Sequence, residues 1–502
     1  MQRSAGVLLH PTSLPSRHGI GDIGPGAHAY VRWLAEAGAK WWQILPLCPP
    51  GPGFSPYSAV STFAGSPWLL SPEALVEDDL LCAADINSPP EFPAGHLHIE
   101  AALAWKSTLL RLSWECFRNS ADRRLYEAFE AFKEQDGWWL DDFGLFAVLK
   151  DHHQGKSWLD WSPQLVSREP GALIEAEKAL KDEINFHQFC QFLFFRQWSR
   201  LKAVAVEHGI SILGDVPIFV ALDSADVWAH PELFLLDENR RPTVVSGVPP
   251  DYFSETGQLW GNPLYDWDRH RKDGYAWWIA RTLHTLDLVD AVRLDHFRGF
   301  SAFWEVSASE TTAVVGRWVP GPGRALFDAL QGAIGSLPMV AEDLGEITPD
   351  VLELRRNLGL PGMAILHFAF GPEPRSTFIP YQLQKDMVIY TGTHDNNTTV
   401  GWYTGDATDE ERDLVRRYTA SDGSDISWQL IRLAMASVAD VAIIPHQDLV
   451  GLGAKSRMNT PGVAEGNWTF RLSQTMLDPF IASRFRNLVE TFGRVRAEGG
   501  RL

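Results

Sequence analysis

Residues 289–295 read Val-Asp-Ala-Val-Arg-Leu-Asp, a short apolar run that ends with a basic and an acidic side chain. Arg293 and Asp295 are two positions apart, so on an extended strand their side chains share one face. A short apolar run of this kind is typical of a strand that is buried on both faces of a parallel sheet. We therefore predict a buried parallel strand whose carboxyl end carries charged groups.

Seven further apolar runs have the same character, and helical patterns or turn signals flank them. The eight predicted strands are residues 6–10, 42–46, 210–217, 289–295, 339–342, 364–368, 387–390 and 441–445. Amphipathic stretches with a helical period precede several of them, at 27–37, 186–208, 277–286, 324–334 and 427–439. Strands that alternate with helices predict an α/β fold with a parallel sheet, and eight such units predict closure into a (β/α)8 TIM barrel.

The uneven spacing of the strands predicts two large insertions. Residues 50–185, between the second and third strands, are expected to be mostly helical, with a helical region from 99 to about 150. Residues 223–274, between the third and fourth strands, form the second insertion. Since no Ser/Gly-rich linker marks off either one, we expect residues 1–502 to form a single catalytic barrel domain.

A doubly wound open sheet is the main alternative to the barrel. That fold should carry a Gly-rich phosphate-binding loop directly after its first strand. Here residues 10–15 read His-Pro-Thr-Ser-Leu-Pro, and the glycines of 19–26 follow this proline-broken loop without the required spacing. The barrel is therefore favoured.

The composition excludes several classes of protein. The 502 residues are 45% hydrophobic and 21% charged, as in an ordinary globular protein, and 63 acidic against 44 basic residues give a net charge of −19. Such a surface repels phosphate backbones and anionic lipids, so no nucleic-acid or membrane partner is expected.

The 4 cysteines lack metal-binding spacing, and no apolar segment is long enough for a signal peptide or a membrane span, so we expect a cytoplasmic protein. The 21 Trp residues suit sugar binding, because a pyranose ring stacks on an aromatic plane.

Charged residues gather at the predicted strand ends, where barrel enzymes place their functional groups. The residues concerned are Asp215, Arg293, Asp295, Glu342, Asp343, His394 and Asp395. A guanidinium beside Asp295 favours the ionised carboxylate that a nucleophile needs, whereas Glu342 with a raised pKa could protonate a leaving oxygen. Two such carboxyls about 5–5.5 Å apart define a retaining glycosidase mechanism. Spacing alone does not choose Glu342 over Asp343.

Several of these residues also have simpler interpretations. His394 and Asp395 could belong to a metal-dependent hydrolase barrel, but a cation at Arg293 is unfavourable beside metal ligands, so no metal is expected. Asp215 could cap a helix or pair with an arginine. His10 is expected to be a structural histidine. Tyr57 and Trp260 could be packing residues, although their Gly- and Pro-rich neighbours place them on loops and favour binding.

Four stretches together resemble the conserved regions of the α-amylase clan. They are residues 213–217, 290–299, 341–345 and 390–396, and they resemble the version found in the amylomaltases, the 4-α-glucanotransferases of glycoside hydrolase family 77. Further stretches are similar to that family alone, at 55–57, 247–254, 257–265, 457–461 and 466–468. The resemblance runs from about residue 6 to residue 472.

The resemblance implies a role for each matching position. Asp295 would be the nucleophile, Glu342 the acid/base and Asp395 the stabiliser of the transition state. The expected substrate-binding residues are Ser55, Tyr57, Asp215, Arg293 and His394, with Trp260 and Phe253 in a loop that covers the acceptor side and shapes water access. The expected partners are maltooligosaccharides and other α-1,4-glucans, with no metal or organic cofactor, and a monomer is compatible with these features.

Three positions depart from the family pattern, which usually has Asp at Asn397, Asn at Ser66 and Gln at His367. These departures bear on substrate size and leave the carboxylates intact. Two alternatives to a transferase stay open, namely a retaining α-glucan hydrolase of the same clan and a glucan-binding barrel without activity. The size of the reaction products separates the transferase from the hydrolase, and retention of all the carboxylates argues against the silent barrel.

Overall fold

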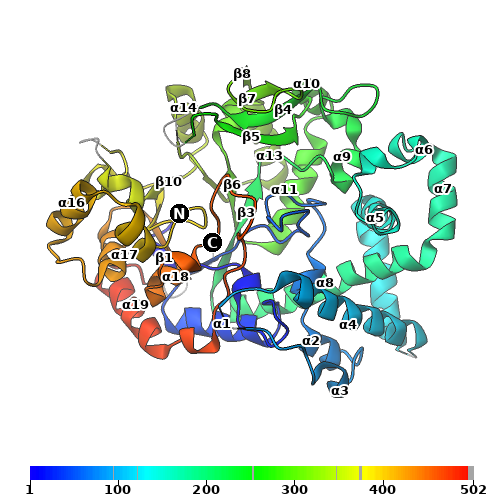
Figure 1. Ribbon diagram of the computed structural model, residues 1–502, viewed down its shortest axis with the longest axis horizontal. Helices are drawn as coiled ribbons and strands as arrows, with labels where there is room; N and C mark the ends of the chain where they lie inside the picture. Colours follow the sequence, from blue (N-terminus) through cyan, green and yellow to red (C-terminus); the bar gives the residue numbers. More distant parts are fainter. Residues whose placement is uncertain (94, 121, 251–253, 346, 372–375, 496–502) are drawn as a thin grey trace.

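The central sheet of the protein has eight parallel strands in the order β10-β11-β12-β1-β2-β3-β6-β9. A computed structural model describes residues 1–93, 95–120, 122–250, 254–345, 347–371 and 376–495. The backbone N–H of Ala341 at the end of β9 donates to the carbonyl of Pro361 just before β10, at 2.9 Å. The two outer strands of the sheet are thus neighbours, and the sheet closes into the predicted barrel (Figure 1).

Each of the eight predicted runs overlaps one observed strand. The strands are β1 (Ser4–Leu8), β2 (Trp41–Gln43), β3 (Ser211–Pro217), β6 (Ala291–Asp295), β9 (Met339–Ala341), β10 (Gly362–Ile365), β11 (Met387–Tyr390) and β12 (Val441–Pro445). The ends differ by a few residues, because local turns end some strands early. β1 ends before His10, which precedes the 3-10 turn Pro11–Ser13, and Leu366–Phe370 forms a 3-10 helix directly after β10.

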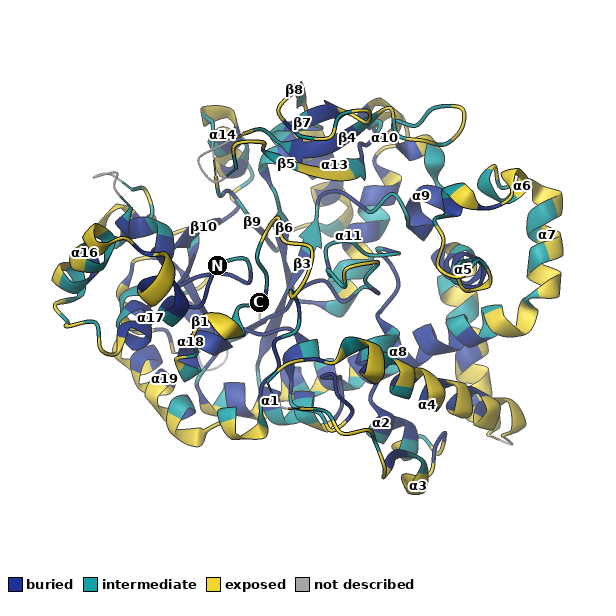
Figure 2. Ribbon diagram, viewed as in Figure 1, coloured by how far each residue is buried: buried dark blue, intermediate teal, exposed yellow. Residues whose placement is uncertain are grey.

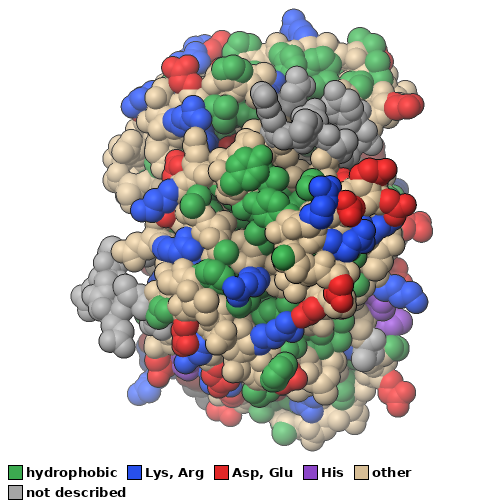
Figure 3. All heavy atoms as spheres, turned by 90° about the vertical axis from the view of Figure 1, so that its left-hand side faces the viewer, with side chains coloured by type: hydrophobic (Ala, Val, Ile, Leu, Met, Phe, Trp, Pro, Cys, Tyr) green, Lys and Arg blue, Asp and Glu red, His purple; other side chains and the backbone are tan. Residues whose placement is uncertain are grey.

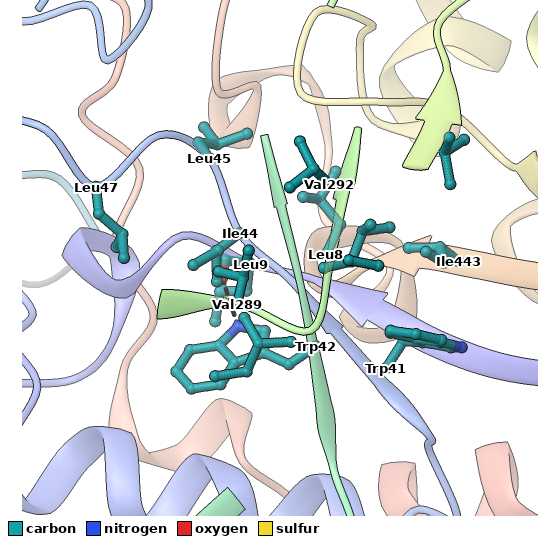
Figure 4. Packing of buried hydrophobic residues seen from close by; sticks show 14 of the residues in the cluster. Leu8, Leu9, Trp41, Trp42, Ile44, Leu45, Leu47, Val289, Val292 and Ile443 are labelled. Carbon is teal, nitrogen blue, oxygen red and sulfur yellow. Dashed lines mark hydrogen bonds between the residues drawn. The ribbon is translucent and has the colours of Figure 1, made fainter. Parts of the chain in front are cut away.

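The barrel wall is tightly packed, because neighbouring strands approach closely and large side chains fill the remaining space. Gly6 in β1 lies against β2, where a Cβ atom would come within 2.6 Å of the Trp41 Cβ, so this position requires glycine. The indole Nε1 of Trp42 donates to the carbonyl of Leu9 at 2.7 Å, which satisfies the polar atom of a fully buried ring (Figure 4). The apolar strand residues therefore form a packed core, and the ligand-binding groups must lie at the strand ends.

Helices cover the outside of the barrel, and their buried faces point toward it (Figure 2). They are α1 (Pro25–Glu36), α8 (Lys181–Glu207), α11 (Ala276–Leu288), α13 (Arg324–Ile334), α14 (Pro349–Asn357), α16 (Asp409–Thr419), α17 (Ile426–Ala436) and α19 (Pro479–Thr491). The buried apolar residues of these helices join the same core as the barrel strands, as binary patterning requires. No helix in the described part of the chain has both the length and the hydrophobicity of a bilayer span.

Helices fill the region between β2 and β3, on the right of Figure 1. They are α2 (Pro72–Glu77), α3 (Ala83–Ile86), α4 (Ile99–Asn119), α5 (Arg123–His152), α6 (Pro163–Val166) and α7 (Pro170–Ala179). The helical region expected at 99 to about 150 is two helices. Asp122 starts the second one, because its carboxylate accepts hydrogen bonds from the backbone N–H groups of Arg124 and Leu125.

A second sheet of four antiparallel strands lies at the top of Figure 1, in the order β5-β4-β7-β8. It was not predicted from the sequence. The segment 223–274 supplies β4 (Val244–Val248) and β5 (Gln258–Pro263), and β7 (Ala302–Ser307) and β8 (Gly316–Pro320) come from the chain after β6. We propose that the insertions and the barrel form one domain, since one continuous apolar core includes Phe129, Trp228 and Phe303 together with the barrel strands.

The surface carries charges of both signs. On the face shown in Figure 3, Lys and Arg side chains lie among Asp and Glu side chains, without a broad field of one sign. A basic stripe of the kind that tracks a phosphate backbone is not present on that face.

Candidate active site

The carboxyl ends of four barrel strands bring the predicted polar residues to one end of the barrel. Asp215 lies in β3, and Arg293 and Asp295 lie in the neighbouring strand β6. Glu342 follows β9 directly, and His394 and Asp395 follow β11. Because parallel strands end at the same edge of the sheet, side chains that are far apart in the sequence meet here.

Arg293 is the fixed cation at the centre of this cluster. Its Nη1 donates to both carboxylate oxygens of Asp215, at 2.9 and 2.8 Å, and its Nη2 lies 2.8 Å from Oδ1 of Asp295. The pairing follows from the register, since Arg293 lies directly opposite Asp215 on the adjacent strand. The Arg293 and Asp215 side chains are buried, whereas 27% of the Asp295 side chain is exposed. The guanidinium is thus paired with a carboxylate that a ligand can reach.

Glu342 is the second carboxyl group of the cluster, and its surroundings disfavour the ionised form. Its carboxyl group accepts hydrogen bonds from the backbone N–H of His296 at 2.7 Å and from that of Leu344 at 3.1 Å. Burial, and then the negative charge of Asp295, raise the pKa of Glu342 to about 7, although Arg293 acts in the other direction. A carboxylic acid with this pKa can donate and accept a proton near neutral pH.

Asp343, the alternative that spacing left open, belongs to a different set of contacts. Its Oδ1 accepts from the backbone N–H of Met363 at 2.8 Å, and its Oδ2 lies 3.2 Å from Nε of Arg355. These partners belong to β10 and α14, and both members of the ion pair are buried. Asp343 therefore connects the barrel wall to a helix, and Glu342 is the residue of the pair that lies beside Asp295.

Asp395 is held by three groups from two segments of the chain. Nδ2 of Asn459 donates to its Oδ1 at 2.6 Å, Nε2 of His394 lies 3.3 Å from its Oδ2, and Arg457 donates to its backbone carbonyl at 2.6 Å. Burial opposes ionisation, but His394 and Asn459 outweigh it and hold the pKa of Asp395 below its usual range. Asp395 is therefore an ionised and fixed acceptor.

Aromatic rings line the same region. The Tyr57 hydroxyl donates to Oδ2 of Asp215 at 2.8 Å, and its ring stacks on His394 with centroids 5.2 Å apart and planes at 14°. Oγ of Ser55 accepts from the backbone N–H of Tyr57 at 3.3 Å, which fixes the loop. Trp468 lies 6.0 Å from Tyr57 and 6.1 Å from His394, between ring centroids.

Trp260 reaches the site from the second sheet. This residue of β5 is 36% exposed, and its ring meets His296 edge-to-face with centroids 4.8 Å apart. His296 directly follows Asp295 and its backbone N–H donates to Glu342, so Trp260 contacts the residue that lies between these two carboxylates. The other predicted loop residue, Phe253, lies outside the described residues.

Asn459, Arg457 and Trp468 contact the site although no role was predicted for them. They fall within the stretches 457–461 and 466–468, whose similarity to the family was the only signal. Nothing in their local pattern indicates that the chain returns to the barrel end. Among the residues that the structure describes, no group of three or more His, Cys, Asp or Glu side chains is arranged to hold a metal ion.

The three departures from the family pattern are buried packing residues. His367 stacks on Trp402 with centroids 4.8 Å apart, and its Nε2 lies 3.1 Å from Oγ1 of Thr399. Nδ2 of Asn397 donates to Asp406 at 3.0 Å. Ser66 precedes the 3-10 turn Pro67–Leu69.

A barrel with a guanidinium-paired carboxylate beside a carboxylic acid of raised pKa has the groups that enzymes acting on glycosidic bonds use. The family model described as 4-alpha-glucanotransferase matches residues 9–476. The chain therefore belongs to this family of enzymes, glycoside hydrolase family 77, which confirms the resemblance seen in the sequence.

Two relatives and one solved structure show how far the similarity extends. The chain is 48% identical to the 4-alpha-glucanotransferase of Thermus thermophilus, over 99% of this chain and 100% of the relative. It is 46% identical to that of Synechocystis sp., over 98% of each chain. The amylomaltase from Streptococcus agalactiae, solved in complex with acarbose, superposes with a TM-score of 0.95 at 34% identity, over 99% of this chain and 100% of that one. The predicted barrel fold is confirmed.

Proposed function

We propose that the protein transfers 4-α-glucanosyl segments from a donor maltooligosaccharide, or from a glucan derived from starch or glycogen, to the 4-hydroxyl of an acceptor glucan or glucose. The observation that carries this proposal is the contrast between two neighbouring carboxyls. Asp295 is paired with Arg293, whereas the pKa of Glu342 is raised to about 7. A nucleophile and an acid/base need these two environments.

In the first step, Asp295 attacks the anomeric carbon of the donor and forms a covalent glycosyl-enzyme. The bond between that carbon and the leaving oxygen breaks, and Glu342 gives its proton to the oxygen. In the second step, the acceptor hydroxyl gives its proton to the Glu342 carboxylate and attacks the same carbon, which releases Asp295. Two inversions at one carbon retain the α configuration.

The groups around the carboxylates position the sugar whose bond is cleaved. Asp395 accepts hydrogen bonds from sugar hydroxyls and helps distort the ring toward its oxocarbenium-like transition state. Tyr57, Asp215, Arg293 and His394 surround the same glucose unit, and Ser55 holds the Tyr57 loop. The fixed geometry of Asp395 between Asn459 and His394 supports this arrangement.

The nature of the acceptor separates a transferase from a hydrolase, since both use the same intermediate. Trp260 and Phe253 shape the acceptor side and limit the access of water, and the edge-to-face contact of Trp260 with His296 supports this role for Trp260. The test is a chromatogram of maltotriose products over time. Transfer gives glucose together with longer oligosaccharides. Only shorter sugars would indicate a hydrolase, and no product at all would contradict both.

We further propose that the enzyme works in the cytoplasm as a monomer, with glucans as its partners. The net charge of −19 and the free thiols of Cys48, Cys82, Cys116 and Cys190 support this setting. Light scattering coupled to size-exclusion chromatography should give a molecular mass near 56.2 kDa. Twice that mass would contradict the monomer.

A further inference from the structure

Two buried histidine nitrogens near the candidate active site have no hydrogen-bond partner among the described residues. They are Nδ1 of His394 and Nδ1 of His10. The His394 side chain uses its other nitrogen, Nε2, for Asp395, and only 5% of His394 and 7% of His10 is exposed. A buried polar atom without a partner is costly, so each of these nitrogens calls for one.

Both histidines line the same small cavity beneath the site. The cavity has a volume of about 20 Å³, and its wall is mixed: Leu9 and Met458 contribute apolar surface, and Asn397, Thr398, Gln447 and Arg457 contribute polar groups. A space of about 10–15 Å³ with two or more polar partners suffices to hold a water molecule. A purely apolar void would offer no such hydrogen-bond partners.

We propose that His10 is a positioning residue, which acts through a water molecule in this cavity that bridges Nδ1 of His10 and Nδ1 of His394. His394 donates through Nδ1–H to the water, and the water donates to Nδ1 of His10. His394 then presents its Nε2–H to Asp395 in a fixed orientation, as a histidine does when its second nitrogen is occupied.

The protonation states of the two rings suit this direction of donation. Burial, and then the charge of His394, lower the pKa of His10 to about 3, so His10 is neutral and can accept at Nδ1. Burial opposes protonation of His394, but the charge of Asp395 and its hydrogen bond raise the pKa of His394 above its ordinary value. The titratable and charged groups that face His394 are Asp395 on its own segment, Arg293 and Asp215 on β6 and β3, Tyr57 on the loop after β2, His10 after β1, and Arg457 in the wall of the same cavity.

The test compares two amide variants that place their polar atoms differently. His10→Asn puts an amide oxygen near the position of Nδ1, whereas His10→Gln reaches the position of Nε2, and the two differ by one methylene. His10→Phe keeps the ring shape without any polar atom. The measurement is the titration midpoint of His394, followed by NMR in histidine-labelled protein and assigned with a His394→Gln sample.

Loss of the acceptor at Nδ1 removes a partner of the protonated form of His394, so the midpoint should move to lower pH. We expect His10→Gln and His10→Phe to lower it by about one pH unit and His10→Asn to stay within about 0.3 units of the wild type. In parallel, kcat/KM for maltotriose should fall about tenfold in His10→Gln and little in His10→Asn.

An unchanged midpoint in His10→Gln, or the same shift in His10→Asn and His10→Gln, would overturn the proposal. A merely structural histidine would lower the thermal stability of the variants without separating the two amides. If His10→Phe fails to fold, the amide pair decides alone. The turnover readout rests on the proposed function, whereas the midpoint does not, so failure of one is distinguishable from failure of the other.

Discussion

The backbone N–H of His296 donates a hydrogen bond of 2.7 Å to the Glu342 carboxyl group, so the residue next to Asp295 holds the second carboxyl in place. His296 has a φ of 50°, in the left-handed region of the backbone, which residues other than glycine seldom adopt. The turn after β6 therefore directs one backbone donor across to the end of β9. Arg293 therefore holds Asp295, and the backbone of the next residue holds Glu342.

The pH dependence of turnover should report the pKa of Glu342. The first step requires the protonated form, and burial together with the Asp295 charge raises this pKa to about 7 from the ordinary value of 4.5. Between pH 5 and 6 Glu342 stays protonated, so we expect its ionisation to leave kcat/KM for maltotriose unchanged. Above about pH 7, kcat/KM should fall about tenfold per pH unit. A pH profile measures this. A fall that begins near pH 4.5, or a flat profile to pH 9, would show that Glu342 is not the acid.

Substitution of the two neighbouring acids should separate chemistry from stability. Glu342→Gln should lower kcat by about a hundredfold to ten-thousandfold, because the amide cannot donate or accept the proton. Asp343→Asn breaks the buried pair with Arg355 and should cost about 3 kcal/mol of unfolding free energy, with kcat of the folded enzyme within about threefold of the wild type. Initial rates and urea unfolding of both variants check this. The reverse pattern would assign the acid to Asp343.

Two changes at Tyr57 should have unequal effects. Tyr57→Phe removes only the hydrogen bond to Asp215, which Arg293 still holds, so kcat/KM should fall about threefold to tenfold. Tyr57→Ala also removes the ring that stacks on His394, and a loss of about a hundredfold or more is expected. Steady-state kinetics on maltotriose measures both, with thermal unfolding as the control for folding. Equal losses would mean that the ring makes no contribution of its own.

Trp260 should influence the choice between sugar and water as the acceptor. Its ring is partly exposed and borders His296, so Trp260→Ala opens the acceptor side without touching a carboxylate. We expect the ratio of hydrolysis to transfer to rise about threefold to tenfold. Trp318→Ala is a matched control, since Trp318 is 38% exposed on the opposite edge strand of the same sheet. If both variants keep the wild-type ratio of reducing ends to longer oligosaccharides, Trp260 does not control water access.

The barrel could be predicted from the sequence because its strands are buried on both faces. Such strands are continuous apolar runs, and the run at Met387–Tyr390 coincides with its observed strand. The second sheet could not be predicted, because its strands are partly exposed and Gly247 and Gly261 interrupt the patterns of β4 and β5. β4 pairs with β7, which follows β6 in the chain, and no local pattern indicates that pairing.

Some residues of the candidate site could likewise be predicted from the sequence, and others could not. Charged residues at strand ends, such as Asp215 and Glu342, stand out because packing alone does not explain a charge there. The choice between Glu342 and Asp343 depends on the tertiary contacts of each side chain. Asp343 forms an ion pair with Arg355 and accepts a hydrogen bond from the backbone of Met363. The partner of Asp395, Asn459, lies on a distant segment, and only the tertiary fold brings it near.

The identity of the residue that carries the glycosyl group is the central claim, and it can be measured directly. The variant Glu342→Gln, supplied with an α-maltotriosyl fluoride, should still form the intermediate, since fluoride leaves without an acid, but should release it slowly without a base. Mass spectrometry of the quenched and digested protein identifies the modified peptide. We predict a maltotriosyl ester on Asp295 in the Glu342→Gln variant. The double variant that carries both Glu342→Gln and Asp295→Asn should form no ester. An adduct on Asp395, or on any other residue, would contradict the assignment of the nucleophile.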